Sequence, residues 1–185
     1  GNAIIPNVKN LTQSYYQTTF GESVYYSEKQ LEQSPLSRVQ KQAAPGNDWA
    51  LGSGHEIEFE YQTNTTADAV RLYKATTTWN STQQKYDIAL SQNGTYATGQ
   101  LYKTITKDEN HTAGKPNTIE EYKNKQGQVI LKRTYNQNGT TLETLDTYYV
   151  YDVYGNLTYV LPPKASQSLI LNSSLLIINL LHALT

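Results

Sequence analysis

Beyond its N-terminal segment, the chain alternates hydrophobic and polar positions, a pattern typical of β-strands with one buried face. Over 57–61, Ile, Phe and Tyr alternate with Glu. Similar segments run over 69–79, 85–90 and 100–107, with a polar turn at 80–84. We therefore expect antiparallel strands here, the first of them with an acidic face exposed to solvent.

Turn-forming residues divide the rest of the pattern. Asn93-Gly94 predicts a tight hairpin, because a primed turn needs positive φ at both central residues. Further on, a tyrosine precedes a glycine three times, and the glycines are Gly127, Gly139 and Gly155. Turn signals about a dozen residues apart are typical of consecutive antiparallel hairpins. We expect each of these glycines to close a structural turn.

Residues 1–50 show no clean period and are interpreted as irregular structure. One short helical piece is expected near 27–34, because Ser27 and Gln30 have the spacing of a capping box. Pro35 would end this helix soon after it begins, since proline removes a backbone donor and clashes with the preceding turn.

The remaining chain is interpreted as an antiparallel β region over 51–117, hairpin repeats over 118–161, and a loop with an apolar segment over 162–185. A second short helical piece is expected near 171–184. This apolar segment is shorter than the ~20 residues of a membrane helix and is interrupted by polar residues, so we expect no membrane span. The predicted fold class is mainly β, with antiparallel hairpins forming a sheet wall.

Tyrosine dominates the aromatic residues, with 16 tyrosines against two phenylalanines and two tryptophans. Tyrosine is favoured in strands and keeps its hydroxyl hydrated while its ring packs, which suits a thin sheet near water. The 15 basic and 16 acidic residues give no basic footprint, so we expect no nucleic-acid partner. There is no cysteine and no methionine, even at position 1, and we expect the chain to be either processed or a fragment of a longer polypeptide.

The strongest candidate for metal or acid–base chemistry is His55, next to Glu56, Glu58 and Glu60. On a strand these glutamates share one face while His55 points to the other, so they do not converge on one metal ion. No nucleophile motif or phosphate-binding loop is present. We therefore expect no enzymatic activity, no cofactor and no metal site, unless two acids from distant strands meet in a cleft.

Trp49 and Trp79 are the two tryptophans of the chain. Core or cross-strand packing is the default role of an aromatic residue in a sheet. Exposed tryptophans could instead stack against a ligand such as a sugar ring. This alternative describes a surface adhesin-like β-domain that binds glycan or protein.

The segment Tyr-Asp-Val-Tyr-Gly-Asn-Leu at 151–157 predicts a hairpin. Aspartate is favoured at the first position of a type I turn, where its carboxylate accepts backbone N–H groups, and glycine is favoured at the fourth position. Asp152 and Gly155 are therefore predicted to fix the tip of this hairpin. We expect Asp152 to cap the turn and not to bind calcium.

This segment resembles the YD repeat of RHS proteins, whose core is Tyr-Asp-x-x-Gly-(Asn/Arg)-Leu. The likeness extends over about 25–165. It is also carried by the segments at 34–39, 44–49, 52–56, 123–127 and 159–163. These look like RHS-repeat proteins of Bacteroidota, in particular the uncharacterised module that lies upstream of the repeats.

In that family, YD repeats coil into a hollow β-shell that can enclose a C-terminal toxin or effector domain, and a core region near its end cleaves itself. Here only 151–157 carries the full motif, and the sequence shows neither the core signature nor the self-cleaving aspartates. The resemblance therefore implies a structural segment, or scaffold, of a secreted or cell-surface bacterial protein. Its implied partners are the remainder of the same polypeptide and any effector domain that the shell encloses.

Overall fold

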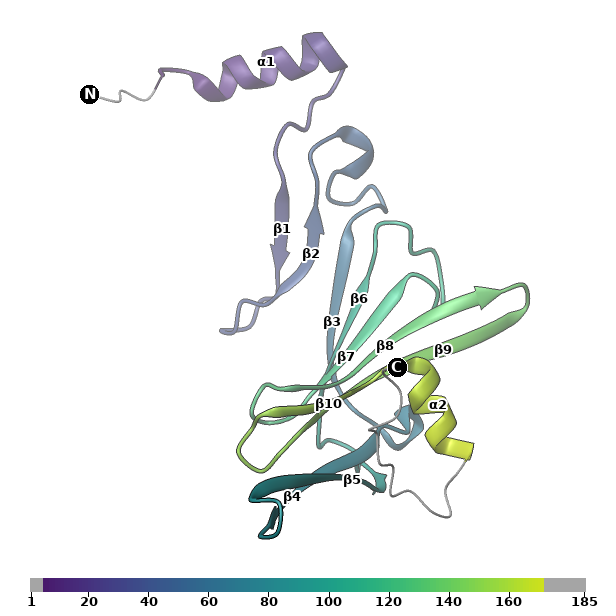
Figure 1. The fold of residues 1–185 in the computed structure, drawn as a ribbon. Helices are drawn as coiled ribbons and strands as arrows, with labels where there is room; N and C mark the ends of the chain where they lie inside the picture. Colours follow the sequence, from purple (N-terminus) through teal and green to yellow (C-terminus); the bar gives the residue numbers. More distant parts are fainter. Residues whose placement is uncertain (1–4, 172–185) are drawn as a thin grey trace. The chain divides into compact units, whose positions relative to one another are not determined.

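The structure, a computed structural model, describes residues 5–171 and is mainly β, which confirms the predicted fold class (Figure 1). The described part has ten strands in two antiparallel sheets, of eight and two strands, and two α-helices. It divides into two compact units. The helical piece expected near 171–184 lies outside the described residues except for its first position.

Unit 1 comprises residues 1–60 and 106–118. Its elements are the helix α1 (Val8–Phe20), the strands β1 (Glu28–Leu31) and β2 (Val39–Ala43), the 3-10 turn η1 (Asn47–Trp49) and the first part of β3 (Ile57–Thr63). β1 and β2 form an antiparallel hairpin. β3 pairs with the other side of β2, where Lys41 faces Glu58.

The prediction of a helix near 27–34 is wrong, because this segment forms strand β1 and the start of the turn that follows it. Pro35 lies in that turn. The Arg38 guanidinium closes the hairpin by donating two hydrogen bonds to the Glu32 carboxylate, of 2.9 and 2.8 Å. Cross-strand pairing therefore outweighs the local capping preference of Ser27.

Helix α1 lies in a segment for which no regular structure is predicted. None of its residues is buried, although Val8, Leu11 and Tyr15 have the three- and four-residue spacing of a helix face. A second local signal is Gly21, which has a φ of 72° and forms the left-handed C-cap. Its N–H donates to the carbonyl of Gln17 at 3.2 Å.

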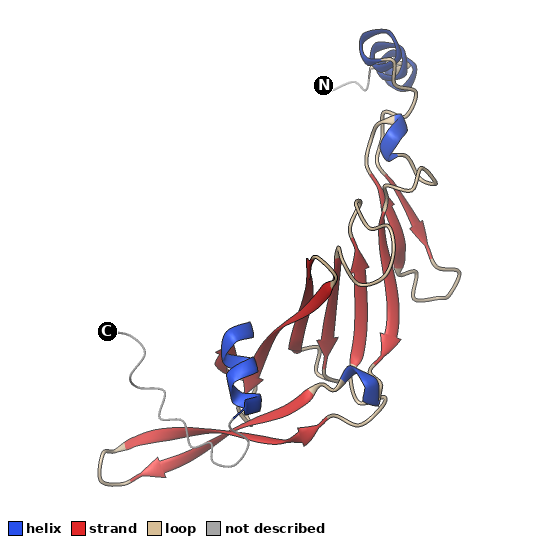
Figure 2. Cartoon of the chain, turned by 90° about the vertical axis from the view of Figure 1, so that its right-hand side faces the viewer, coloured by secondary structure: helices blue, strands red, loops and turns tan. Residues whose placement is uncertain are grey.

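Unit 2 comprises residues 61–105 and 119–185. Its elements are the rest of β3, the 3-10 turn η2 (Thr66–Asp68), β4 (Arg71–Asn80), β5 (Lys85–Thr95), most of β6 (Tyr102–Lys107) and β7 (Thr118–Lys123), β8 (Val129–Asn138), β9 (Thr141–Tyr151), β10 (Leu157–Leu161) and α2 (Pro163–Leu171). Strands β6 to β10 are neighbours in this order. β4 and β5 form a separate two-stranded sheet, the lowest pair of strands in Figure 2. Of the loop and apolar segment expected over 162–185, the described residues from Pro163 to Leu171 form a helix, and proline suits its first position.

The core of unit 2 is built on one row of residues that crosses four neighbouring strands. Tyr122, Leu131, Tyr148 and Leu161 are cross-strand partners in β7, β8, β9 and β10. Each is at most 3% exposed. Tyr73 of β4 packs edge-to-face on Tyr148, with ring centroids 5.0 Å apart, and α2 packs against β9 (Figure 1). The alternating pattern thus places tyrosines, and not only aliphatic side chains, in the core.

The prediction of a hairpin turn at Asn93-Gly94 is wrong, because strand β5 continues through both residues. The turn between β4 and β5 lies in the polar stretch after Asn80, where it is also predicted. Opposite Asn93-Gly94 the ladder has one residue more on β5 than on β4, and Gly94 has a φ of 74°. The dipeptide therefore forms a β-bulge, which needs the same positive φ as a hairpin turn.

The acidic face predicted at 56–60 is solvated only in part: the side chains of Glu58 and Glu60 are 34% and 40% exposed, whereas Glu56 is buried. Lys41 Nζ lies 2.8 Å from Glu56 and 2.6 Å from Glu58, and Lys107 Nζ lies 3.3 Å from Glu58 and 2.6 Å from Glu60. Glu56 is 6% exposed, and the Lys41 ammonium lowers its pKa to about 2. The glutamates form a ladder of ion pairs because the lysines lie opposite them.

Candidate functional site

The turn at 152–156 joins β9 to β10 and carries the YD-like motif. The Asp152 carboxylate accepts hydrogen bonds from the backbone N–H groups of Tyr154 and Asn156, at 2.9 and 2.8 Å. The Asn156 side chain and these backbone bonds hold the pKa of Asp152 below its ordinary value. Gly155 donates its N–H to the Asp152 carbonyl at 3.1 Å and has a φ of 86°. The structure therefore places Asp152 at the first and Gly155 at the fourth position of the turn.

A second turn, at 124–128 between β7 and β8, has the same geometry with asparagine in place of aspartate. Asn124 Oδ1 accepts the backbone N–H groups of Gln126 and Gln128, at 3.0 and 2.9 Å. Gly127 donates its N–H to the Asn124 carbonyl at 3.0 Å and has a φ of 81°. Gly127 is recognised from the sequence, whereas Asn124 is missed. The available signal for Asn124 is its position three residues before the glycine.

These two turns lie side by side. Gln128 Nε2 donates a hydrogen bond to the Gly155 carbonyl at 3.2 Å, so the end of one turn contacts the other. Gly139, with a φ of 58°, closes the turn between β8 and β9 at the other end of these strands. Alternate turns of the sheet therefore lie at one end and are joined there by a hydrogen bond.

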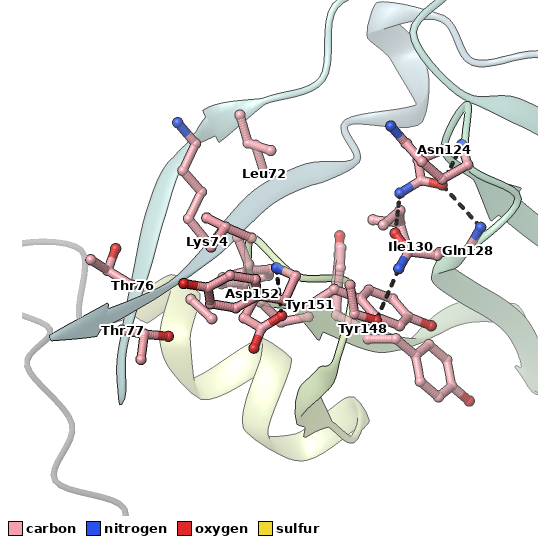
Figure 3. Close-up of a pocket in the computed structure, with 18 of the residues that line it drawn as sticks. Leu72, Lys74, Thr76, Thr77, Asn124, Gln128, Ile130, Tyr148, Tyr151 and Asp152 are labelled. Atoms are coloured by element: carbon pink, nitrogen blue, oxygen red, sulfur yellow. Dashed lines mark hydrogen bonds between the residues drawn. The ribbon is translucent and has the colours of Figure 1, made fainter. Parts of the chain in front are cut away.

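A pocket of about 680 Å³ lies between β4 and the two turns (Figure 3). β4 contributes residues 72–77 and β9 with its turn contributes residues 148–155. Six tyrosines line it, namely Tyr73, Tyr96, Tyr148, Tyr149, Tyr151 and Tyr154. The Asp152 carboxylate is engaged in its own turn, and the Tyr148 hydroxyl accepts the backbone N–H of Arg71 at 3.3 Å. The rings and hydroxyls of this pocket suit packing against another chain segment.

A buried ionic network joins η2 to β6 and β7. Lys103 Nζ lies 2.8 Å from the Asp68 carboxylate and 3.2 Å from that of Glu120. The Tyr122 hydroxyl lies 2.9 Å from Asp68 and 2.6 Å from Glu120. Lys103 is 6% exposed and Glu120 is fully buried. Burial raises the pKa of the Tyr122 hydroxyl, and the neighbouring Glu120 carboxylate raises it further.

A second ion pair extends this network to β8 and β9. Arg133 donates two hydrogen bonds to the Asp146 carboxylate, of 2.7 and 2.9 Å, and a third to the Asp68 carbonyl at 2.9 Å. The Arg133 and Asp146 side chains are 12% and 14% exposed. Arg71 donates to the carbonyl of Ser166 in α2 at 2.7 Å, and the Ser166 hydroxyl donates to the Asp146 carbonyl at 3.0 Å. These bonds fix η2 and α2 to the sheet.

Lowering the pH is expected to destabilise unit 2 through Asp68. Burial raises the pKa of this carboxyl, but hydrogen bonds from Lys103, Thr65 and Tyr122 outweigh burial and lower it to about 2, against an ordinary value of 3.8. Because the unfolded chain binds the proton more tightly, the stabilisation is present above pH 3.8 and is lost as the pH falls toward 2. By linkage it amounts to about 2 kcal/mol.

Urea unfolding at a series of pH values checks this expectation, with Asp68→Asn as the comparison. The free energy of unfolding of the wild type should fall more steeply than that of the variant between about pH 4 and pH 2. Parallel curves would show that Asp68 is not the titrating group.

Replacing Gly155 is expected to weaken the turn between β9 and β10. Its φ of 86° costs a residue with a Cβ about 1–2 kcal/mol, and an added Cβ would lie 3.3 Å from Gln128 Nε2. Gly155→Ala should lower the free energy of unfolding by this amount. Gly155→Asn should lower it less, because asparagine tolerates positive φ. Urea unfolding followed by circular dichroism measures both variants, and an alanine variant as stable as the wild type would contradict the expectation.

The two tryptophans each have their own aromatic neighbour. Trp79, in unit 2, is 53% exposed and faces its cross-strand partner Tyr86, with ring centroids 4.9 Å apart. Trp49, in unit 1, is 42% exposed and lies beside His55, with ring centroids 5.3 Å apart. Trp79 therefore has the cross-strand packing expected by default, whereas Trp49 lines a pocket of its own.

Between residues 5 and 171, no helix is both long and apolar enough to cross a membrane. In the same part of the chain, no group of three or more His, Cys, Asp or Glu side chains is placed to hold a metal ion.

Comparison with protein families finds a similarity over the N-terminal part of the chain. Residues 1–63 match the family described as "Domain of unknown function (DUF6443)". This stretch ends where strand β3 ends. No curated protein matches the chain, and no solved structure matches it.

Proposed function

We propose that the chain is a structural segment of a secreted RHS-repeat protein, where it forms part of a β-shell or scaffold that encloses or presents a C-terminal effector. The observation that carries this proposal is the stacking of the turns at 124–128 and 152–156. Each turn has a side-chain oxygen acceptor at its first position and glycine at its fourth, and Gln128 joins the two. In a sheet that repeats one hairpin in this way, a further hairpin can be added through the same contacts that join the existing ones.

Strand β10 is the place where further hairpins would attach. It is the last strand in the order β6 to β10 and pairs only with β9 among the described strands. Its residues Leu157 and Val160 are 51% and 48% exposed. An edge strand with exposed apolar side chains is a ready template for another strand. In this proposal the added strand comes from the remainder of the same polypeptide.

Amide hydrogen exchange in β10 tests the proposal. Exchange is compared between the isolated chain and the full RHS-type polypeptide that would contain it. Pairing of β10 with a following repeat should slow the exchange of its outward amide groups by about tenfold or more. Strand β8, which already has a neighbour on both sides, is the internal control and should not change. Equal exchange of β10 in the two samples would reject the proposed wall.

A further inference from the structure

Unit 1 contains a pocket of about 510 Å³ beside Trp49. Its lining combines apolar residues, among them Ile57, with the polar residues Ser27, Gln42 and Glu109. The volume lies within the range of about 300–1,000 Å³ that is usual for small-molecule sites. An exposed aromatic ring next to several hydrogen-bonding groups is the kind of lining that fixes a ligand's orientation.

Trp49 is held in place by its own turn. Asn47 Oδ1 accepts hydrogen bonds from the backbone N–H and the hydroxyl of Ser23, at 3.0 and 2.7 Å, which ties η1 to the segment after α1. The backbone N–H of Trp49 donates to the Gly46 carbonyl at 3.2 Å. A Cβ on Gly46 would lie 3.1 Å from Trp49 Cδ1, so glycine lets the indole lie against the backbone. A turn whose backbone is already ordered loses little conformational freedom when a ligand binds.

His55 gives this pocket a hydrogen-bonding group with a defined tautomer. Its Nδ1 lies 3.1 Å from the carbonyl oxygen of Glu109. Because a carbonyl oxygen can only accept, Nδ1 carries the hydrogen, and Nε2 of the neutral ring is an acceptor. The imidazole lies beside the Trp49 indole, with ring centroids 5.3 Å apart. An acceptor and an aromatic face are therefore next to each other.

We propose that this pocket binds carbohydrate, with a pyranose ring stacked on Trp49 and its hydroxyl groups bonded to His55 and Gln42. A pyranose has an apolar C–H face and a rim of hydroxyls that both donate and accept. These features match an exposed indole beside an imidazole acceptor and an amide. A quaternary ammonium ligand matches less well, since its recognition uses a cage of several aromatic faces. This binding role does not depend on the proposed wall function.

Nuclear magnetic resonance can follow this binding, because the chain has two tryptophans and therefore two indole N–H signals. The isotope-labelled chain is titrated with the methyl glycosides of glucose, galactose, mannose and N-acetylglucosamine, and with cellobiose and chitobiose. Trp79→Phe assigns the two signals. At least one sugar should shift the Trp49 signal saturably, with a Kd of about 1 mM or lower, while the Trp79 signal stays in place.

Variants separate ring stacking from folding. Trp49→Ala should weaken binding of that sugar about tenfold or more. His55→Ala, which keeps the indole, should weaken it about fivefold. Trp79→Ala is the matched control and should bind as the wild type does. Circular dichroism and the remaining indole signal report on folding.

Three results would overturn the carbohydrate site. The first is that no sugar of this panel shifts the Trp49 signal. The second is that both indole signals shift alike, which indicates unspecific contact. The third is that the His55→Ala variant, or a folded Trp49→Ala variant, binds the sugar as tightly as the wild type. The sugar titration does not depend on the hydrogen exchange of β10. The carbohydrate proposal and the wall proposal can therefore fail independently.

Discussion

Replacing Lys103 by alanine is expected to destabilise unit 2 by about 3–5 kcal/mol, the cost of removing one partner from a buried ion pair. The Lys103 ammonium lies 2.8 Å from Asp68 and 3.2 Å from Glu120, and its side chain is 6% exposed. Without it, two carboxylates share a site with little access to water, and the Tyr122 hydroxyl has a single proton to donate. The loss is a large part of the about 5–15 kcal/mol that stabilises a typical domain.

Urea unfolding followed by circular dichroism measures this loss. Lys123→Ala is the matched control, because Lys123 also pairs with a glutamate, Glu121, at 2.8 Å but is 40% exposed. An exposed pair contributes about 0–1 kcal/mol. Lys103→Met keeps most of the apolar stem and removes the charge, which separates electrostatics from packing. If the Lys103→Ala substitution lowered the free energy of unfolding no more than Lys123→Ala does, the buried network would not stabilise the fold.

Truncation of Leu131 to alanine is expected to cost about 2–5 kcal/mol, from lost burial and from the cavity that remains. Leu131 is fully buried and lies between Tyr122 and Tyr148 in the cross-strand row. Both tyrosine hydroxyls are hydrogen-bonded, so neither ring can move freely into the space. We therefore expect a value in the upper half of this range.

The control for this truncation is Leu142→Ala in the paired strand β9. Leu142 is 41% exposed, so its truncation should change the free energy of unfolding by about 0.5 kcal/mol or less. Urea unfolding of both variants gives the comparison. Similar losses at the two leucines would mean that the row through Leu131 is not the centre of the core.

The hairpins over 118–161 could be predicted from the sequence because their two signals are local. Burial of one face produces the alternation at Tyr148 and Val150 in β9. Positive φ at Gly127, Gly139 and Gly155 requires glycine-like freedom at each turn. Both signals depend on neighbours a few residues away. They therefore appear in the sequence without knowledge of the tertiary structure.

Other elements could not be predicted because their causes are not local. Helix α1 buries no residue, and its apolar positions Val8, Leu11 and Tyr15 span only about two turns. The strand nature of β1 comes from its pairing with β2, which outweighs the capping preference of Ser27. Glu56 has the pattern of a solvent-facing residue, and only the opposing Lys41 makes its burial acceptable.

The candidate sites likewise divide into those with local sequence signals and those that depend on distant residues. Asp152 and Gly155 are recognisable because turn chemistry is confined to four residues. The network around Lys103 and Glu120 is not recognisable, since single charges in a sequence usually indicate surface positions. Asp68, which pairs with Lys103, comes from a different part of the chain. Trp49 is noticed from its residue type, but its pocket depends on Glu109 and His55 meeting across 54 residues of chain.

The bond between Arg71 and Ser166 has a consequence for the order in which the chain can fold. It joins residues 95 positions apart, and the bond from Arg133 to Asp68 spans 65. The Arg71 guanidinium can bond to the Ser166 carbonyl only after α2 has been synthesised, whereas its bond to the Tyr73 hydroxyl joins residues two positions apart. Contacts of such long sequence separation form slowly compared with hairpins. Unit 2 therefore reaches its complete set of contacts late in folding, after α2 has joined the sheet.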